Sequence, residues 1–146
     1  MPIKRTDHIS LNVVNLEEAI HFFSLCGLEV RGRWEMKGEL LDRLLSLEGA
    51  ETECVALGLP GEPLWLELVR FKHPRDTPSV IQSVHAGGLR HLCFEVTALT
   101  ALVERLADNG YQSIGDVANY ENEYRLCYVR GPEDVIIELA EKIGPV

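Results

Sequence analysis

Two histidines begin the two halves of an internal repeat in this chain. His8 lies in the segment DHISLNV and His91 in the segment RHLCFEV, 83 residues later. Gly27 and Gly110 are also 83 residues apart, so the two segments align without a gap. A repeated histidine in an alternating segment indicates a function shared by both halves, whereas a lone histidine near a strand start is usually exposed or hydrogen-bonded.

Two glutamates repeat in the same way near the end of each half. Glu67 lies in PLWLELV and Glu138 in DVIIELA, 71 residues apart. Two imidazoles and two carboxylates form a sensible ligand set for one divalent ion of Zn, Ni, Co, Mn or Fe, with positions left for water or substrate. The sequence therefore predicts a metal site made by His8, Glu67, His91 and Glu138.

Side-chain alternation indicates how four such residues could meet. In a strand, successive side chains point to opposite faces, so the apolar residues around each histidine and glutamate lie on the other face. Those apolar faces must pack against the amphipathic helices. All four polar residues then lie on the faces turned away from the helices, where pseudo-twofold symmetry could bring them to one point.

The repeat predicts an α+β fold of two βαβββ modules, with a curved mixed sheet around a central metal cavity. In module one (about 6–71) we expect a helix near 16–26 and strands near 6–13, 28–35, 52–59 and 64–71. In module two (about 90–140) we expect a helix near 98–109 and strands near 90–96, 112–117, 125–130 and 135–140. A linker of about 72–89, in which Thr77 and Pro78 could begin a short helix, joins them into a single domain, 1–146.

An insertion is expected in module one. The repeat offset falls from 83 to 71, so module one has 12 more residues between its histidine and its glutamate. The segment KGELLDRLLSLEG, residues 37–49, has leucines near helical spacing and is the natural place for them. The sequence therefore predicts an extra helix there. Asn15 or Asn12 could cap the first helix.

Composition restricts the partners and the cellular location. The formal net charge of -9 and the pI of about 5.0 disfavour nucleic acids and anionic membranes, which need a basic surface. The N-terminal segment lacks the apolar stretch of a signal peptide, and no run approaches the roughly 18 apolar residues of a membrane span. Four cysteines without a CxxC pair indicate reduced thiols, so we expect a cytoplasmic protein.

The chain resembles the vicinal oxygen chelate superfamily, which includes glyoxalases, bleomycin-resistance proteins and extradiol dioxygenases. DHISLNV, LWLELV, LRHLCFEV and YRLCYVRGPEDVIIELAE carry the resemblance, which covers nearly the whole chain. Within the superfamily, the His, Glu, His, Glu set is most similar to that of glyoxalase I and methylmalonyl-CoA epimerase. Relatives that hold glutathione tend to have Arg and Asn where this chain has Asn12 and Phe71, so glutathione use is left open.

The resemblance implies a metal-dependent lyase or isomerase of the glyoxalase-like type, which moves a proton next to a carbonyl of a small molecule. Glu138 is the expected base and Glu67 its partner on the opposite side of the substrate. The residues expected to line the substrate cavity are Asn12, Trp65, Cys93 and Arg125. Two alternatives are an Fe(II)-dependent ring-cleaving dioxygenase and a metal-free protein that sequesters a drug or metabolite. Many relatives are homodimers, so we expect a homodimer.

Overall fold

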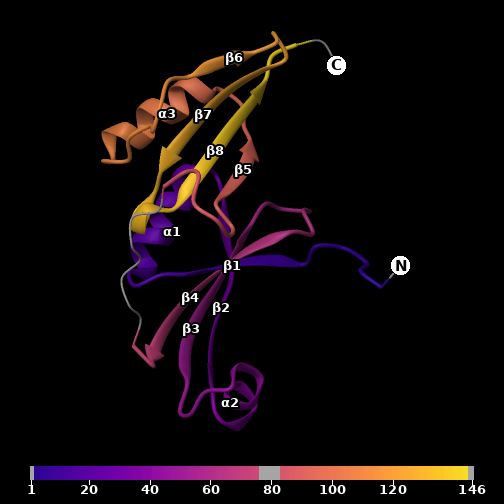
Figure 1. Ribbon diagram of the computed structural model, residues 1–146, viewed down its shortest axis with the longest axis vertical. Coiled ribbons are helices and arrows are strands. Elements are labelled where there is room, and N and C mark those ends of the chain that lie inside the picture. The colour runs from indigo at the N-terminus through magenta and orange to yellow at the C-terminus, as the bar shows by residue number, and fades with distance from the viewer. Residues whose placement is uncertain (1, 76–82, 145–146) are drawn as a thin grey trace. The chain divides into compact units, whose positions relative to one another are not determined.

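The computed structural model describes residues 2–75 and 83–144. The chain forms two compact units, Met1–Pro78 and Ser79–Val146, and each holds one four-stranded sheet (Figure 1). The short helix considered at Thr77 and Pro78 lies outside the described residues. None of the helices in the described ranges is long and apolar enough to cross a membrane.

The first unit contains one βαβββ module with an additional helix. Its elements are β1 (His8–Asn12), α1 (Leu16–Leu25), β2 (Glu29–Lys37), α2 (Glu39–Leu45), β3 (Glu51–Gly58) and β4 (Trp65–His73). The strand order is β1-β4-β3-β2, in which β1 runs parallel to β4 and the other pairs are antiparallel. This is the mixed sheet of the predicted module. The chain leaves β1 through α1, forms β2 and β3, and ends with β4 beside β1.

The second unit repeats this order without the additional helix. Its elements are β5 (His91–Glu95), α3 (Leu99–Asp108), β6 (Ala118–Tyr120), β7 (Tyr124–Arg130), a short 3₁₀ turn (Pro132–Asp134) and β8 (Ile136–Lys142). The strand order is β5-β8-β7-β6, again with the first pair parallel. The α+β fold of two βαβββ modules is therefore confirmed.

One strand prediction was wrong. Residues 112–117 do not form a strand; Ser113 makes only an isolated bridge to Val129, and the edge strand β6 begins at Ala118. The segment contains Gly115 and Asp116, and both residue types are depleted in strands. Pairing resumes where Asn119 and Asn122 close the turn before β7, with the Asn119 Oδ1 accepting from the Asn122 amide at 2.8 Å.

Helices α1 and α3 each cover the apolar face of their own sheet. In α1 the buried side chains are Leu16, Ala19, Phe22 and Phe23, and in α3 they are Leu99, Leu102 and Leu106. The sheets contribute buried Val55 and Leu68 in the first unit and Val129 and Leu139 in the second. Burying one such Leu or Phe side chain contributes about 1.5–3 kcal/mol, so these stripes fix which face of each sheet stays uncovered by its helix. Asn15 caps α1, as one of the two candidates, by accepting from the Glu18 amide at 3.1 Å.

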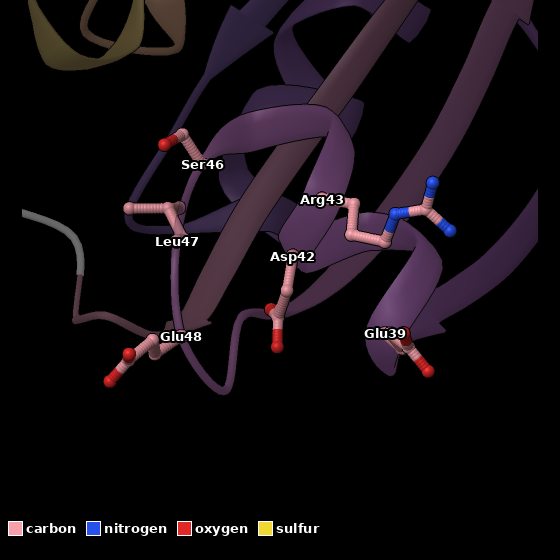
Figure 2. Close-up of a pocket in the computed structure, with 6 residues that line it drawn as sticks. All are labelled: Glu39, Asp42, Arg43, Ser46, Leu47 and Glu48. Atoms are coloured by element: carbon pink, nitrogen blue, oxygen red, sulfur yellow. The ribbon is translucent and has the colours of Figure 1, made fainter.

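The predicted insertion is confirmed as helix α2. It lies between β2 and β3, whereas β6 and β7 of the second unit are joined by residues 121–123 alone. Asp42 closes the loop after α2, because its carboxylate oxygens accept from the amides of Gly49 at 2.9 Å and Ala50 at 2.8 Å. Figure 2 shows the shallow hollow at this turn, whose side chains spread around it rather than converge; they are Glu39, Asp42, Arg43, Ser46, Leu47 and Glu48. We assign this hollow a structural role, since its central carboxylate already accepts two hydrogen bonds.

Candidate active site

Strand register places each histidine and its glutamate on one sheet face. In the first unit His8 pairs with Trp65 and Ser10 with Glu67, so His8 and Glu67 lie on the same face, two positions apart. In the second unit Cys93 pairs with Glu138, which puts His91 on the Glu138 face in the same way. Partners in a ladder point to the same side, so both pairs lie opposite the faces that α1 and α3 cover.

His8 is held by a carboxylate and by an indole ring. Its Nδ1 lies 2.8 Å from Asp7 Oδ2, and its ring stacks on Trp65 with centroids 4.5 Å apart. The hydrogen bond to His8, with the charge of Arg5, lowers the pKa of Asp7, so this partner is a carboxylate at neutral pH. A histidine whose Nδ1–H donates to a carboxylate is oriented to bind a metal through Nε2.

Glu67 has small neighbours along its row of the sheet. Its Oε1 accepts a hydrogen bond from the Ser10 hydroxyl at 2.7 Å. On its other side, Ala56 and then Gly32 occupy the paired positions of β3 and β2. One hydroxyl therefore orients this carboxylate, and no bulky side chain stands beside it in the row.

Glu138 is held more firmly than Glu67. Its Oε1 accepts from the Tyr128 hydroxyl at 2.6 Å and lies 3.2 Å from His91 Nε2, and its side chain is only 16% exposed. The His91 ring also meets the Tyr128 ring edge to face, with centroids 5.1 Å apart. The hydrogen bond to Glu138, with desolvation and the carboxylate charge, raises the pKa of Tyr128 to about 12. Tyr128 is therefore a neutral donor to this carboxylate at physiological pH.

Cys93 lies beside Glu138 on the same face. Partial desolvation, followed by the charge of Glu138 and a hydrogen bond to it, raises the pKa of the Cys93 thiol to about 11. The residue is exposed as a whole, yet its sulfur remains a protonated thiol at neutral pH. This position supports the expectation that Cys93 faces the cavity, as a neutral side chain and not as a thiolate nucleophile.

The donor geometry in the second unit is compatible with a shared metal ion. Two donor atoms about 2.1 Å from one ion, at tetrahedral or octahedral angles, lie roughly 3.0–3.4 Å apart. The 3.2 Å between His91 Nε2 and Glu138 Oε1 falls in this range. Each unit by itself offers one histidine and one glutamate, and within residues 2–75 and 83–144 no group of three or more His, Cys, Asp or Glu side chains could hold a metal. The four-residue metal site stays a prediction.

Asn12 and Trp65 have the orientation that the cavity prediction requires, but Arg125 does not. Asn12 pairs with Val69 and so shares the Glu67 face, as Trp65 does. Arg125 pairs with Glu141, on the face opposite Glu138. Its guanidinium donates to the Thr100 hydroxyl of α3 at 3.0 Å. Arg125 is therefore oriented toward the helix side of the sheet, and its prediction as a substrate-binding residue was wrong.

The predicted orientation of Arg125 was wrong because the hairpin loop before β8 differs by one residue from the length that the prediction assumed. Arg130 pairs with Ile136, so five residues, 131–135, make the turn, and Tyr128 rather than Arg125 shares the face of Glu138. A one-residue change in register moves every side chain of a strand to the other face. Glu133 and Asp134 both have positive φ in this turn, and the sequence signal that could have shown the odd length is the GPED segment itself. Tyr128 was missed for the same reason.

The comparisons with known proteins identify the family. Residues 7–128 match the family described as the glyoxalase/bleomycin resistance protein/dioxygenase superfamily. The chain belongs to this superfamily. The resemblance to vicinal oxygen chelate proteins is thereby confirmed. A comparison with curated protein sequences gives no match.

Solved structures agree with this assignment. A glyoxalase family protein from Bacillus cereus is 35% identical, with a TM-score of 0.93 over 99% of this chain and 97% of that one. The trypanothione-dependent glyoxalase I of Leishmania major is 20% identical, with a TM-score of 0.63 over 95% and 87%. The fosfomycin resistance protein FosX of Listeria monocytogenes is 16% identical, with a TM-score of 0.65 over 99% and 94%. The last two likenesses show the fold alone.

Proposed function

We propose that this superfamily member is a metal-dependent lyase or isomerase of the glyoxalase-like type, which moves a proton next to a carbonyl of a small molecule. The observation that carries the proposal is the contact of His91 with Glu138, at register positions that His8 and Glu67 occupy in the first unit. One divalent ion of Zn, Ni, Co, Mn or Fe would be held by these four residues, a histidine and a glutamate from each unit. When bound, such an ion supplies Lewis-acid polarisation of the substrate oxygen.

Glu138 is the base in this proposal, and Glu67 is its partner. A base must have a free electron pair on an oxygen whose position is fixed, and Tyr128 together with His91 fixes the carboxylate of Glu138. Tyr128 donates to the Glu138 side chain and, with its raised pKa, does not lose its own proton. Glu67, oriented by Ser10, would accept or return a proton from its own side.

Solvent deuterium wash-in at the substrate α-carbon tests the assignment directly. Metal-loaded protein would be incubated in D₂O with hemithioacetals, acyl-CoA epimers and α-hydroxyketones, and exchange followed by NMR or mass spectrometry. Glu138→Gln should slow exchange about 10²–10⁴-fold, because an amide cannot accept the proton. It should keep part of the metal, since the amide oxygen can still coordinate. Glu141→Gln, the same change on the opposite face of β8, is the matched control and should exchange normally.

The same experiment separates the alternatives. If Glu138→Gln keeps full deuterium exchange and Glu67→Gln loses it, Glu67 is the base and Glu138 its partner. Normal deuterium exchange in both variants would refute the mechanism. Oxygen uptake with catechols, without wash-in, would indicate a ring-cleaving dioxygenase. Protein that binds ligand without metal, exchange or oxygen uptake would be a drug- or metabolite-binding protein.

The proposal extends to assembly and location. We propose a homodimer and a cytoplasmic protein, as expected from the family and from the reduced cysteines. A monomer mass by light scattering at micromolar concentration would contradict the dimer.

A further inference from the structure

Both tryptophans of the chain lie on the Glu67 face of the first sheet. Trp65 is next to the β1 edge, and Trp34 is on β2, where it pairs with Cys54. The two indoles meet edge to face with centroids 6.1 Å apart, although β3 separates their strands. Ala56 and Gly32, the small residues in the row of Glu67, leave room for this approach.

The aromatic surface continues to the predicted metal ligand. The His8 ring stacks on Trp65 at an interplanar angle of 23°, so imidazole and indole form one flat stack. Trp34, Trp65 and His8 thus form a connected group, which we name the aromatic group, beside the carboxylate of Glu67. Trp34 and Trp65 are half-buried, so each retains an accessible part of its ring. Aromatic rings favour other rings in offset or edge-to-face geometry over saturated groups of the same size.

The charges around this face favour an uncharged ligand group. The paired positions on the Glu67 face hold no Lys or Arg within the described strands; their side chains are those of His8, Ser10, Asn12, Glu29, Gly32, Trp34, Met36, Thr52, Cys54, Ala56, Gly58, Trp65, Glu67, Val69 and Phe71. Of the other basic residues of these strands, Arg33 is paired with the carboxylate of Glu17, Arg70 with that of Glu53, and Lys72 with that of Glu35. Arg31, at the β2 bulge, does reach this face, where its side chain lies beside Gly58 and Trp65, but its guanidinium donates to the Leu59 carbonyl at 2.8 Å.

We propose that the aromatic group selects substrates in which the reacting carbonyl is attached to an aromatic ring, that is, aryl ketones. This inference rests on the proposed function, because it assigns the non-reacting part of the same substrate. The ring would stack on the indoles, while the vicinal oxygens of the ligand lie toward His8 and Glu67. The equivalent row of the second unit cannot take this part, because Tyr128 stands where the first unit has Ala56.

Ligand binding, measured without turnover, tests the selection. The two probes are 2-hydroxyacetophenone and cyclohexyl hydroxymethyl ketone, which share the oxygen pair and the ring size and differ in aromaticity. Stacking on one ring strengthens binding by roughly 2- to 13-fold, so we expect the aryl ketone to bind about tenfold more tightly by calorimetry. It should also quench tryptophan emission, which in this chain comes only from Trp34 and Trp65.

Variants locate the preference. Trp65→Leu and Trp34→Leu should each reduce the ratio of the two dissociation constants to about threefold or less, whereas Trp65→Phe should keep most of it. Leu44→Ala, which shortens an exposed side chain of α2, is the control and should leave the ratio unchanged. Melting curves identify any variant that fails to fold, and the comparison of the two probes on the native protein then carries the test.

The outcomes distinguish this inference from the proposed function. A tenfold preference with no proton exchange would reject the lyase or isomerase and retain the aryl selection. Equal dissociation constants for the two probes in the native protein would overturn the selection whatever the activity. A preference that survives Trp34→Leu and Trp65→Leu would overturn it as well.

Discussion

Glu67 and Glu138 occupy equivalent positions of a repeated fold, but their neighbours differ. Across the strand pair, Ala56 stands beside Glu67 and Tyr128 beside Glu138. Ser10 gives Glu67 one hydrogen bond, whereas the second unit surrounds Glu138 with the Tyr128 hydroxyl, His91 and the Cys93 thiol. The repeat has kept the backbone positions of the carboxylates and changed what holds them.

The two histidines differ as well. Asp7 orients His8 through a contact with its Nδ1. In the second unit, by contrast, Glu138 itself contacts His91, at its Nε2. In our account, the first unit supplies an oriented ligand and an aromatic surface, and the second supplies a firmly held base. Equivalent positions of a duplicated fold can differ in this way, because strand register fixes positions but leaves the neighbouring side chains to vary.

Among the variants that test the difference between the two histidines, we expect the largest effect, a loss of metal affinity, at Asp7. Asp7→Ala removes the carboxylate that orients His8, and such partners typically contribute 10–100-fold to metal affinity. We expect a loss of that size, measured by competition with a chelator, and an unchanged melting temperature. Glu17→Ala, which breaks the surface pair with Arg33, is the control. Unchanged affinity in Asp7→Ala would remove the distinction between the two histidines.

A smaller effect is expected from the hydrogen bonds to the two glutamates. Tyr128→Phe should slow deuterium wash-in by about tenfold, because a hydrogen bond to a charged group contributes about 1.5–3 kcal/mol. Ser10→Ala removes the single donor to Glu67 and should slow it by about threefold or less. Metal content should stay the same in both variants. If Ser10→Ala has the larger effect, the assignment of the base to the second unit is wrong.

The sequence predicted most of the fold because the signals were periodic. Alternation fixed the faces of His8, Glu67, His91 and Glu138, and the offset change located α2. The predictions were wrong in turns and loops, where hydrophobic periodicity carries no information about length or pairing. The five-residue turn after Arg130 reversed the expected face of β7, and the segment around Gly115 was too rich in turn residues to pair.

Partners that depend on cross-strand register were also beyond the sequence. Tyr128 reaches Glu138 only because 128 and 138 pair, and Trp34 approaches Trp65 only because small residues lie between them. No spacing along the chain predicts either contact. The four-residue metal site itself rests on the repeat and on the family, and its test is a measurement of metal binding.

Metal stoichiometry tests the central claim most directly. The ions bound per chain at saturation would be measured by mass spectrometry for the native protein, His8→Ala and His91→Ala. One site made by both units predicts one ion per chain, and a loss of affinity of at least about tenfold in either variant. Two ions per chain, or a single ion whose affinity is unchanged in His8→Ala, would contradict a site shared by His8, Glu67, His91 and Glu138.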